Sequence, residues 1–101
     1  MKKIVVDESG KSDRFTIIFN FWEQYEDIEK FASVLKRKLK AKVLRVTDGP
    51  DSRIWEMSLE GIEFLLINND PYGNYLLAET EPAVELLKKY LLRLQTIFEE
   101  N

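Results

Sequence analysis

The sequence contains no cysteine and no histidine among its 101 residues. Without cysteine the chain can form no disulfide framework and has neither a thiolate nucleophile nor a thiolate metal ligand. Without histidine it has no imidazole metal ligand and no base for a Ser-His-Asp triad. These absences exclude disulfide-stapled domains, Cys- or His-ligated metal sites and His-dependent hydrolases.

Long apolar runs are missing as well. No stretch approaches the roughly 18–20 residues of a membrane-spanning helix, and the N-terminal MKKIVVDESG has too few apolar residues for a secretory signal. We therefore expect a cytoplasmic protein with no membrane partner. Lys and Arg number 15 against 18 Asp and Glu, which gives a formal net charge of −3. A mildly acidic chain is poorly suited to the phosphate backbone, so we expect no nucleic-acid partner, whereas a basic protein would suit it.

The composition and pattern predict one α+β domain over residues 1–101. The chain is 45% hydrophobic and 33% charged, which is typical of a folded globular domain rather than a disordered one. Its periodicities change in the order β-β-α-β-β-β-β-α, without internal repeats or linkers. We expect a two-layer fold with a mainly antiparallel sheet of five or six strands and two helices packed on it.

Both helices are marked by start signals and an apolar stripe. Asn20 and Glu23 predict a capping box for a helix that runs to about Lys40. Thr80 predicts a cap and Pro82 a first turn for a helix that runs to about Glu99. The apolar stripes, at three- to four-residue spacing, comprise Ile28, Phe31, Ala32, Leu35 and Leu39 in the first helix, and Val84, Leu87, Leu91, Leu94 and Phe98 in the second.

Three turns predict the register of a strand meander over residues 42–79. Glu60-Gly61 suits a two-residue hairpin turn, which pairs Leu59 with Ile62, Met57 with Phe64 and Trp55 with Leu66. A four-residue loop, 49–52, pairs Asp48 with Arg53, Val46 with Trp55 and Leu44 with Met57 on the same face. On the other face it pairs Thr47 with Ile54 and Arg45 with Glu56. A turn that places Asn68 opposite Asn74 pairs Leu66 with Leu76 and Phe64 with Ala78. All three turns put apolar pairs on one face, so we expect Trp55 to be a core residue.

The other face of this meander carries a second apolar group edged by carboxylates. It comprises Ile54, Leu65, Ile67, Tyr75 and Leu77, with Glu56, Ser58, Glu63 and Glu79. If both helices cover the Trp55 face, these residues form an exposed patch of the kind that marks an interface. The alternative is that one helix, or the N-terminal hairpin, folds over them.

Several patterns that resemble chemical sites do not satisfy the requirements of those sites. Glu56 and Glu63 are neighbours in the predicted register, but an open sheet offers no cleft for acid–base catalysis. Asp48, Asp51 and Asp70 lie in turns whose spacing matches no calcium loop, and turns favour Asp for its backbone chemistry. Gly10-Lys11-Ser12 lacks the first glycine and the helix of a phosphate loop, and 36-KRK-38 is typical of a solvated helix end. We therefore expect no metal, no cofactor and no catalytic activity.

Part of the chain resembles small bacterial domains that have a Trp-bearing strand and a Glu-Gly hairpin. The resemblance lies in 49-GPDSRIWEMSLEGIEFLL-66 and in 76-LLAE-79 after the next turn. In size, acidity and architecture the chain is also similar to immunity proteins of bacterial toxin–immunity systems, such as those of contact-dependent growth inhibition. The resemblance covers about residues 43–79 and its motifs are structural. It implies a protein that neutralises a toxin domain by binding it, and a basic toxin domain would fit the acidic chain.

We therefore expect a protein-binding module whose sharpest form is an immunity protein. The alternative is a small bacterial protein with a housekeeping role that forms a homo-oligomer, such as a homodimer, through the same patch. A carboxylate-based enzyme is the third. The expected partner-binding residues are Ile54, Glu56, Glu63, Leu65, Ile67, Tyr75, Leu77 and Glu79 on the sheet, followed by Asp48, Asp51, Asp70 and Tyr72 in the turns.

Overall fold

The protein folds as one six-stranded antiparallel sheet with two helices, which confirms the predicted element order and class. The structure is a computed structural model and describes residues 3–7, 13–69 and 73–100. Its elements are β1 (Ile4–Asp7), β2 (Phe15–Phe19), the 3₁₀ turn η1 (Tyr25–Asp27), α1 (Ile28–Leu39), β3 (Lys42–Asp48), β4 (Ser52–Leu59), β5 (Ile62–Asn69), β6 (Gly73–Ala78) and α2 (Glu81–Glu100).

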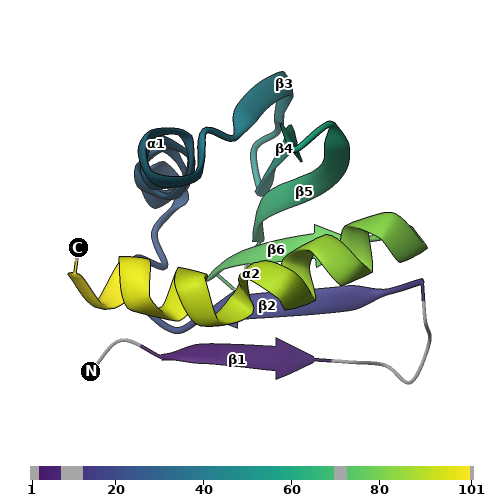
Figure 1. Cartoon of the computed structure of the whole chain (residues 1–101). Helices are drawn as coiled ribbons and strands as arrows, with labels where there is room; N and C mark the ends of the chain where they lie inside the picture. The colour runs from purple at the N-terminus through teal and green to yellow at the C-terminus, as the bar shows by residue number, and fades with distance from the viewer. Residues whose placement is uncertain (1–2, 8–12, 70–72, 101) are drawn as a thin grey trace.

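The N-terminal hairpin extends the sheet and does not fold over it. The strand order is β1-β2-β6-β5-β4-β3, with every neighbouring pair antiparallel. Strand β2 pairs along β6, so the hairpin joins the meander at its last strand (Figure 1). This answers one of the questions that the sequence leaves open, because the hairpin cannot cover the meander from this position.

Both helices pack on the same face of the sheet, which we call the inner face. The buried residues of α1 and α2 form a single cluster with alternate residues of the strands, and Figure 1 shows the sheet curling around the helical layer. The strand residues in this cluster are Phe15, Ile17, Phe19, Met57, Leu59, Phe64, Leu66, Leu76 and Ala78. The predicted apolar stripes of both helices contribute to it, and Thr80 caps α2 by accepting a hydrogen bond from the Ala83 N–H at 3.3 Å, as predicted.

The predicted register of β4, β5 and β6 is confirmed. Leu59 lies opposite Ile62, and Trp55 lies opposite Leu66. Asn68 lies opposite Asn74. The hairpin turn has φ of 56° at Glu60 and 78° at Gly61, as a turn with two left-handed residues requires. Turn chemistry at this one position therefore fixes which residues of β4 and β5 share a face.

The predicted pair of Leu44 with Met57 is wrong, because β3 contains a bulge. Val43 lies opposite Met57, the register shifts before Arg45, and the rest of the predicted pairing follows. The extra residue is Leu44, which is 51% exposed. Bulges are common in edge strands, where they bend the strand and interrupt further pairing.

The first helix begins later than predicted, and Asn20 does not cap it. Asn20 instead closes the open end of the β1–β2 hairpin, since its Oδ1 accepts from the Lys3 N–H at 2.6 Å and its own N–H donates to the Lys3 carbonyl. The helical turn starts with η1, where the Gln24 N–H donates to Asp27 Oδ2 at 3.0 Å. Asn20 follows strand β2 directly, so its side chain and backbone hydrogen-bond to Lys3 across the hairpin and do not cap the helix.

Trp55 is half-buried at the margin of the core, so its prediction as a core residue is only partly confirmed. It lies opposite Val46 of the edge strand β3, and Val46 is itself exposed. The indole Nε1–H donates to Asp48 Oδ1 at 3.2 Å. The helical layer thus leaves this corner of the inner face partly open.

Candidate functional site

The face of the sheet opposite the helices carries a row with one residue from every strand, and five of its six members are apolar. We call this face the outer face and this set the outer row: Val5, Ile18, Tyr75, Ile67, Ile54 and Thr47. Each member lies directly opposite the next across a strand pair, from β1 at one edge to β3 at the other. An antiparallel sheet with one solvated face normally has polar side chains there, so an apolar row of this length is a departure from that pattern.

The outer row is most exposed toward its ends. Val5 is 49% exposed and Ile54 is 38% exposed. Ile67 is only 7% exposed, although it does not belong to the helix-covered core cluster. It lies between Ile54 and Tyr75, so neighbours on the same face flank it on both sides. The predicted patch residues Ile54, Ile67 and Tyr75 are thus brought together, and Val5 and Ile18 extend them.

A second row on the outer face turns from apolar to charged. It runs Asp7, Thr16, Leu77, Leu65, Glu56 and Arg45, again with one residue from each strand. Leu77 is 7% exposed and Leu65 is half-buried. At the β3 edge, Arg45 Nε lies 3.8 Å from Glu56 Oε2, which confirms the predicted opposite-charge pairing.

Beside the second row lies a shallow pocket whose rim carries three carboxylates. We call it the acidic pocket; it measures about 220 Å³ and is lined by Glu56, Glu63, Phe64, Leu65, Leu77, Glu79 and Thr80. Glu63 and Glu79 are exposed, and neither has an ion-pair partner within the described part of the chain. The structure therefore gathers the predicted charged residues at one place, next to the leucines that were predicted with them.

The second group of predicted residues lies elsewhere. Asp48 is held by Arg53 through two hydrogen bonds of 2.9 Å, Nε to Oδ1 and Nη2 to Oδ2. These bonds hold the pKa of the Asp48 carboxyl below its usual value, and the Trp55 bond acts in the same direction. Its carboxylate is thus occupied within the fold. Asp51 lines a different cleft, whereas Asp70 and Tyr72 lie outside the described residues.

A buried arginine on the inner face was not singled out by the sequence reasoning. Arg53 is 7% exposed, and its guanidinium carbon lies 4.7 Å from the centre of the Tyr25 ring and 5.3 Å from that of Trp55. Its Nη1 donates to the Tyr25 carbonyl at 3.2 Å and to Glu29 at 3.3 Å. The available signal was the predicted pairing of Asp48 with Arg53 on the face that the helices cover. A charge placed there must find partners inside the fold.

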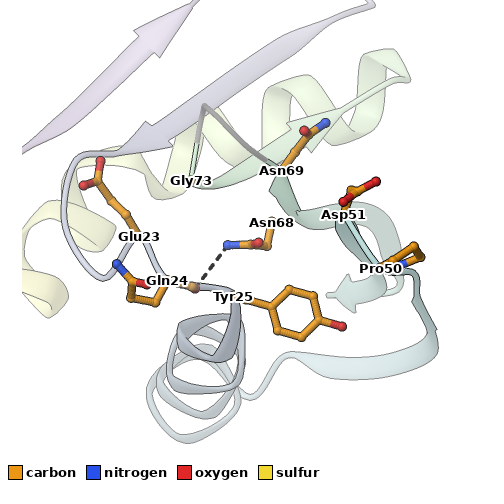
Figure 2. Close-up of a pocket in the computed structure, with 8 residues that line it drawn as sticks. All are labelled: Glu23, Gln24, Tyr25, Pro50, Asp51, Asn68, Asn69 and Gly73. Atoms are coloured by element: carbon orange, nitrogen blue, oxygen red, sulfur yellow. Dashed lines mark hydrogen bonds between the residues drawn. The ribbon is translucent and has the colours of Figure 1, made fainter.

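A polar cleft lies at one end of the sheet, and Tyr25, whose ring packs against Arg53, is part of its lining. It measures about 440 Å³ and is lined by Glu23, Gln24, Tyr25, Pro50, Asp51, Asn68, Asn69 and Gly73 (Figure 2). The Asn68 amide donates to the Gln24 carbonyl at 3.2 Å, the bond drawn in Figure 2, and the Tyr25 hydroxyl donates to the Gly49 carbonyl at 3.2 Å. These bonds join the segment before α1 to the strand ends, which gives the polar lining a structural role.

Among the described residues the side chains are not arranged for metal binding. No group of three or more His, Cys, Asp or Glu side chains in residues 3–7, 13–69 and 73–100 is placed to hold a metal ion. No helix in those ranges is long and apolar enough to cross a membrane.

No protein family, curated protein or solved structure matches this chain. Its function is inferred below from its own residues.

Proposed function

We propose that this chain is a non-catalytic, cytoplasmic protein-binding module that binds its partner through the outer face of the sheet. The observation that carries the proposal is the outer row, a strip that is apolar on five of the six strands and ends at Thr47 on β3, on the face opposite both helices. Burial of apolar surface is the main favourable term in association, and exposed apolar patches of this kind mark interfaces. Val5 and Ile54, which are the most exposed apolar side chains on the strip, are the expected first contacts.

The charges around the strip favour a basic partner. The outer face carries the carboxylates of Asp7, Glu56, Glu63 and Glu79. Its cations on β3 are Arg45, which pairs with Glu56, and Lys42, which lies opposite Ser58. A positive surface would be drawn to this rim and oriented by it before the apolar contacts form. The resemblance to immunity proteins gives the sharpest form of the proposal: the partner is a basic toxin domain that the chain neutralises by binding.

A second copy of the chain fits this face less well. Face-to-face packing would place the carboxylates of both copies around one interface, and like charges at an interface oppose association. We therefore propose a different protein as the partner, with the homodimer as the outcome that would replace it.

The test is co-expression with the toxin domain encoded beside the gene for this chain. Ile54→Lys places a charge in the outer row, and Leu92→Lys is the matched control, because Leu92 is 74% exposed on α2 in the other layer. We expect the wild-type chain and the Leu92→Lys variant to protect cells from the toxin and to co-purify with it. The Ile54→Lys variant should fold, as circular dichroism would show, but fail to protect.

Two results would count against this proposal. Protection by Ile54→Lys equal to that of the wild type would remove the outer face from the interface. A gene neighbourhood without a toxin would remove the immunity role. Light scattering after size exclusion separates the homodimer: a wild-type dimer that Ile54→Lys converts to a monomer would replace the foreign partner with a second copy.

A further inference from the structure

The outer face combines three features in one place: an apolar strip, an apolar-floored pocket beside it and carboxylates on the rim of that pocket. Leu65 and Leu77 supply the floor, and both belong to the second row, directly beside the outer row. Glu56, Glu63 and Glu79 stand around them. A side chain that fills this pocket must therefore have an apolar stem and a positively charged end.

One carboxylate of the rim already has a cation of the fold beside it. Arg45 of the edge strand places its Nε 3.8 Å from Glu56 Oε2, so one rim carboxylate already faces a guanidinium. The other two, Glu63 and Glu79, make no ion pair in the described part of the chain. Lys42 lies in the same cross-strand row as Ser58 and Glu63, at the β3 edge. The two carboxylates leave negative charge on the side of the pocket away from Arg45, where an incoming cation would meet it.

We infer that the acidic pocket receives one arginine side chain of the protein partner, whose neighbouring apolar residues lie along the outer row. This inference rests on the proposed function and names the residue that the partner inserts. Arginine fits because its planar guanidinium has five N–H donors and can serve more than one carboxylate at once. It is also more weakly hydrated than an ammonium group, so it is more easily placed against leucine side chains. Its methylene stem covers the floor while the charge stays at the rim.

The inference can be tested on the full chain without knowing the partner. The probe is Nα-acetyl-arginine amide, titrated at millimolar concentration while the methyl and amide NMR signals are followed. Nα-acetyl-citrulline amide is the matched neutral probe, because it has the same length and shape without the charge. Nα-acetyl-lysine amide tests the choice of cation. We expect the arginine probe to shift the Leu65 and Leu77 methyl signals, and the other two probes to shift them much less.

The variants locate the site. Glu63→Gln with Glu79→Gln removes two exposed carboxylates and should weaken binding of the arginine probe by about 1.4-fold to fivefold for each one, as exposed ion pairs imply. Glu85→Gln with Glu99→Gln removes the same charge from exposed positions of α2 and should leave binding unchanged. Equal weakening by both double variants would show a general charge effect and overturn the inference.

The remaining outcomes also decide the matter. Equal shifts with the citrulline probe would show that the charge is not recognised, and equal binding of the lysine probe would overturn the choice of arginine. Failure of the probe, with Ile54→Lys still abolishing protection, would reject the arginine pocket and leave the protein-binding function intact. Binding of the probe together with full protection by Ile54→Lys would support the arginine pocket and reject the outer row as the protein-binding surface.

Discussion

The two faces of this sheet are built from the same six strands, yet they differ in what covers their apolar side chains and in what pairs with their polar ones. On the inner face the apolar residues are covered by two helices, and its polar residues find partners inside the fold. On the outer face the apolar residues lie opposite one another across the strands, on the side away from both helices, and the carboxylates of Glu63 and Glu79 have no ion-pair partner in the described part of the chain. The inner face thus accounts for stability, and the outer face is where a partner can add contacts.

The polar part of the inner face makes this contrast specific. One cross-strand row, Asp48, Arg53, Asn68 and Asn74, lies on the face that the helices cover. Asn74 is fully buried, accepts from the Asn68 amide at 3.2 Å and donates to the Trp22 carbonyl at 2.6 Å. Buried polar groups stabilise a fold only when they are hydrogen-bonded, and this row meets that condition within one chain.

The largest expected effect comes from truncating neighbouring leucines of β5 that point to opposite faces. Leu66 is fully buried under the helices, so Leu66→Ala should lower the free energy of unfolding by about 2–5 kcal/mol. Leu65 is half-buried on the outer face, and folding therefore removes less of its apolar area from water. Leu65→Ala should lower the free energy of unfolding by less than about 1.5 kcal/mol. Urea denaturation of both variants measures the difference.

The two variants change the same residue type in the same strand, so strand propensity cancels between them. Equal losses would show that the outer face is covered as well as the inner face is, and that the contrast between the two faces is false. A Leu65→Ala variant that is stable but binds the arginine probe less tightly would sharpen the contrast.

The parts of the fold that the sequence predicted are those that turns determine locally. Glu60-Gly61 requires two left-handed residues in succession, and this requirement fixes β4 against β5. The bulge at Leu44 was missed because an edge strand has a partner on one side only and tolerates an extra residue. Asn20 was assigned to the helix because its side chain can cap a helix or close a hairpin, and only the tertiary contact with Lys3 decides between the two.

The same limit applies to the candidate site. Its β3 to β6 members were predicted, because the turns place Ile54, Ile67 and Tyr75 opposite one another. Val5 and Ile18 were missed because no short turn connects β2 to β6, so their pairing depends on contacts between distant segments. The sequence therefore predicted the centre of the outer row and not its full width.

A smaller effect is expected from the buried amides. Asn74→Ala removes the donor to the Trp22 carbonyl and the acceptor for Asn68, which leaves buried polar groups without partners. We expect a loss of about 1–3 kcal/mol in the free energy of unfolding. Ser58→Ala is the outer-face control, since Ser58 is half-buried there, and it should cost less than about 0.5 kcal/mol. Equal costs in chemical denaturation would mean that the inner polar row is not a stabilising feature.

The smallest effect concerns Glu60, in the turn between β4 and β5. Its carboxylate accepts from the Tyr90 hydroxyl and from Lys89 Nζ at 3.2 Å, which ties the β4–β5 turn to α2. The Tyr90 bond, followed by the Lys89 bond, lowers the pKa of Glu60 below its ordinary value of 4.5. A carboxyl with a depressed pKa stabilises the fold above its unfolded pKa, and this contribution is lost as the pH falls through the folded value.

Glu60→Gln should therefore be slightly less stable than the wild type at pH 7, and the difference should disappear as the pH falls below about 4.5. The same bond raises the pKa of Tyr90, so the substitution should also bring the tyrosine titration closer to its ordinary value of 10.0. Thermal unfolding at a series of pH values and NMR titration of the Tyr90 ring measure the two effects. Tyr90→Phe removes the same bond from the other side, so combining it with Glu60→Gln should add little. A stability difference that persists at acid pH would show that the effect of the substitution does not come from the charge of Glu60.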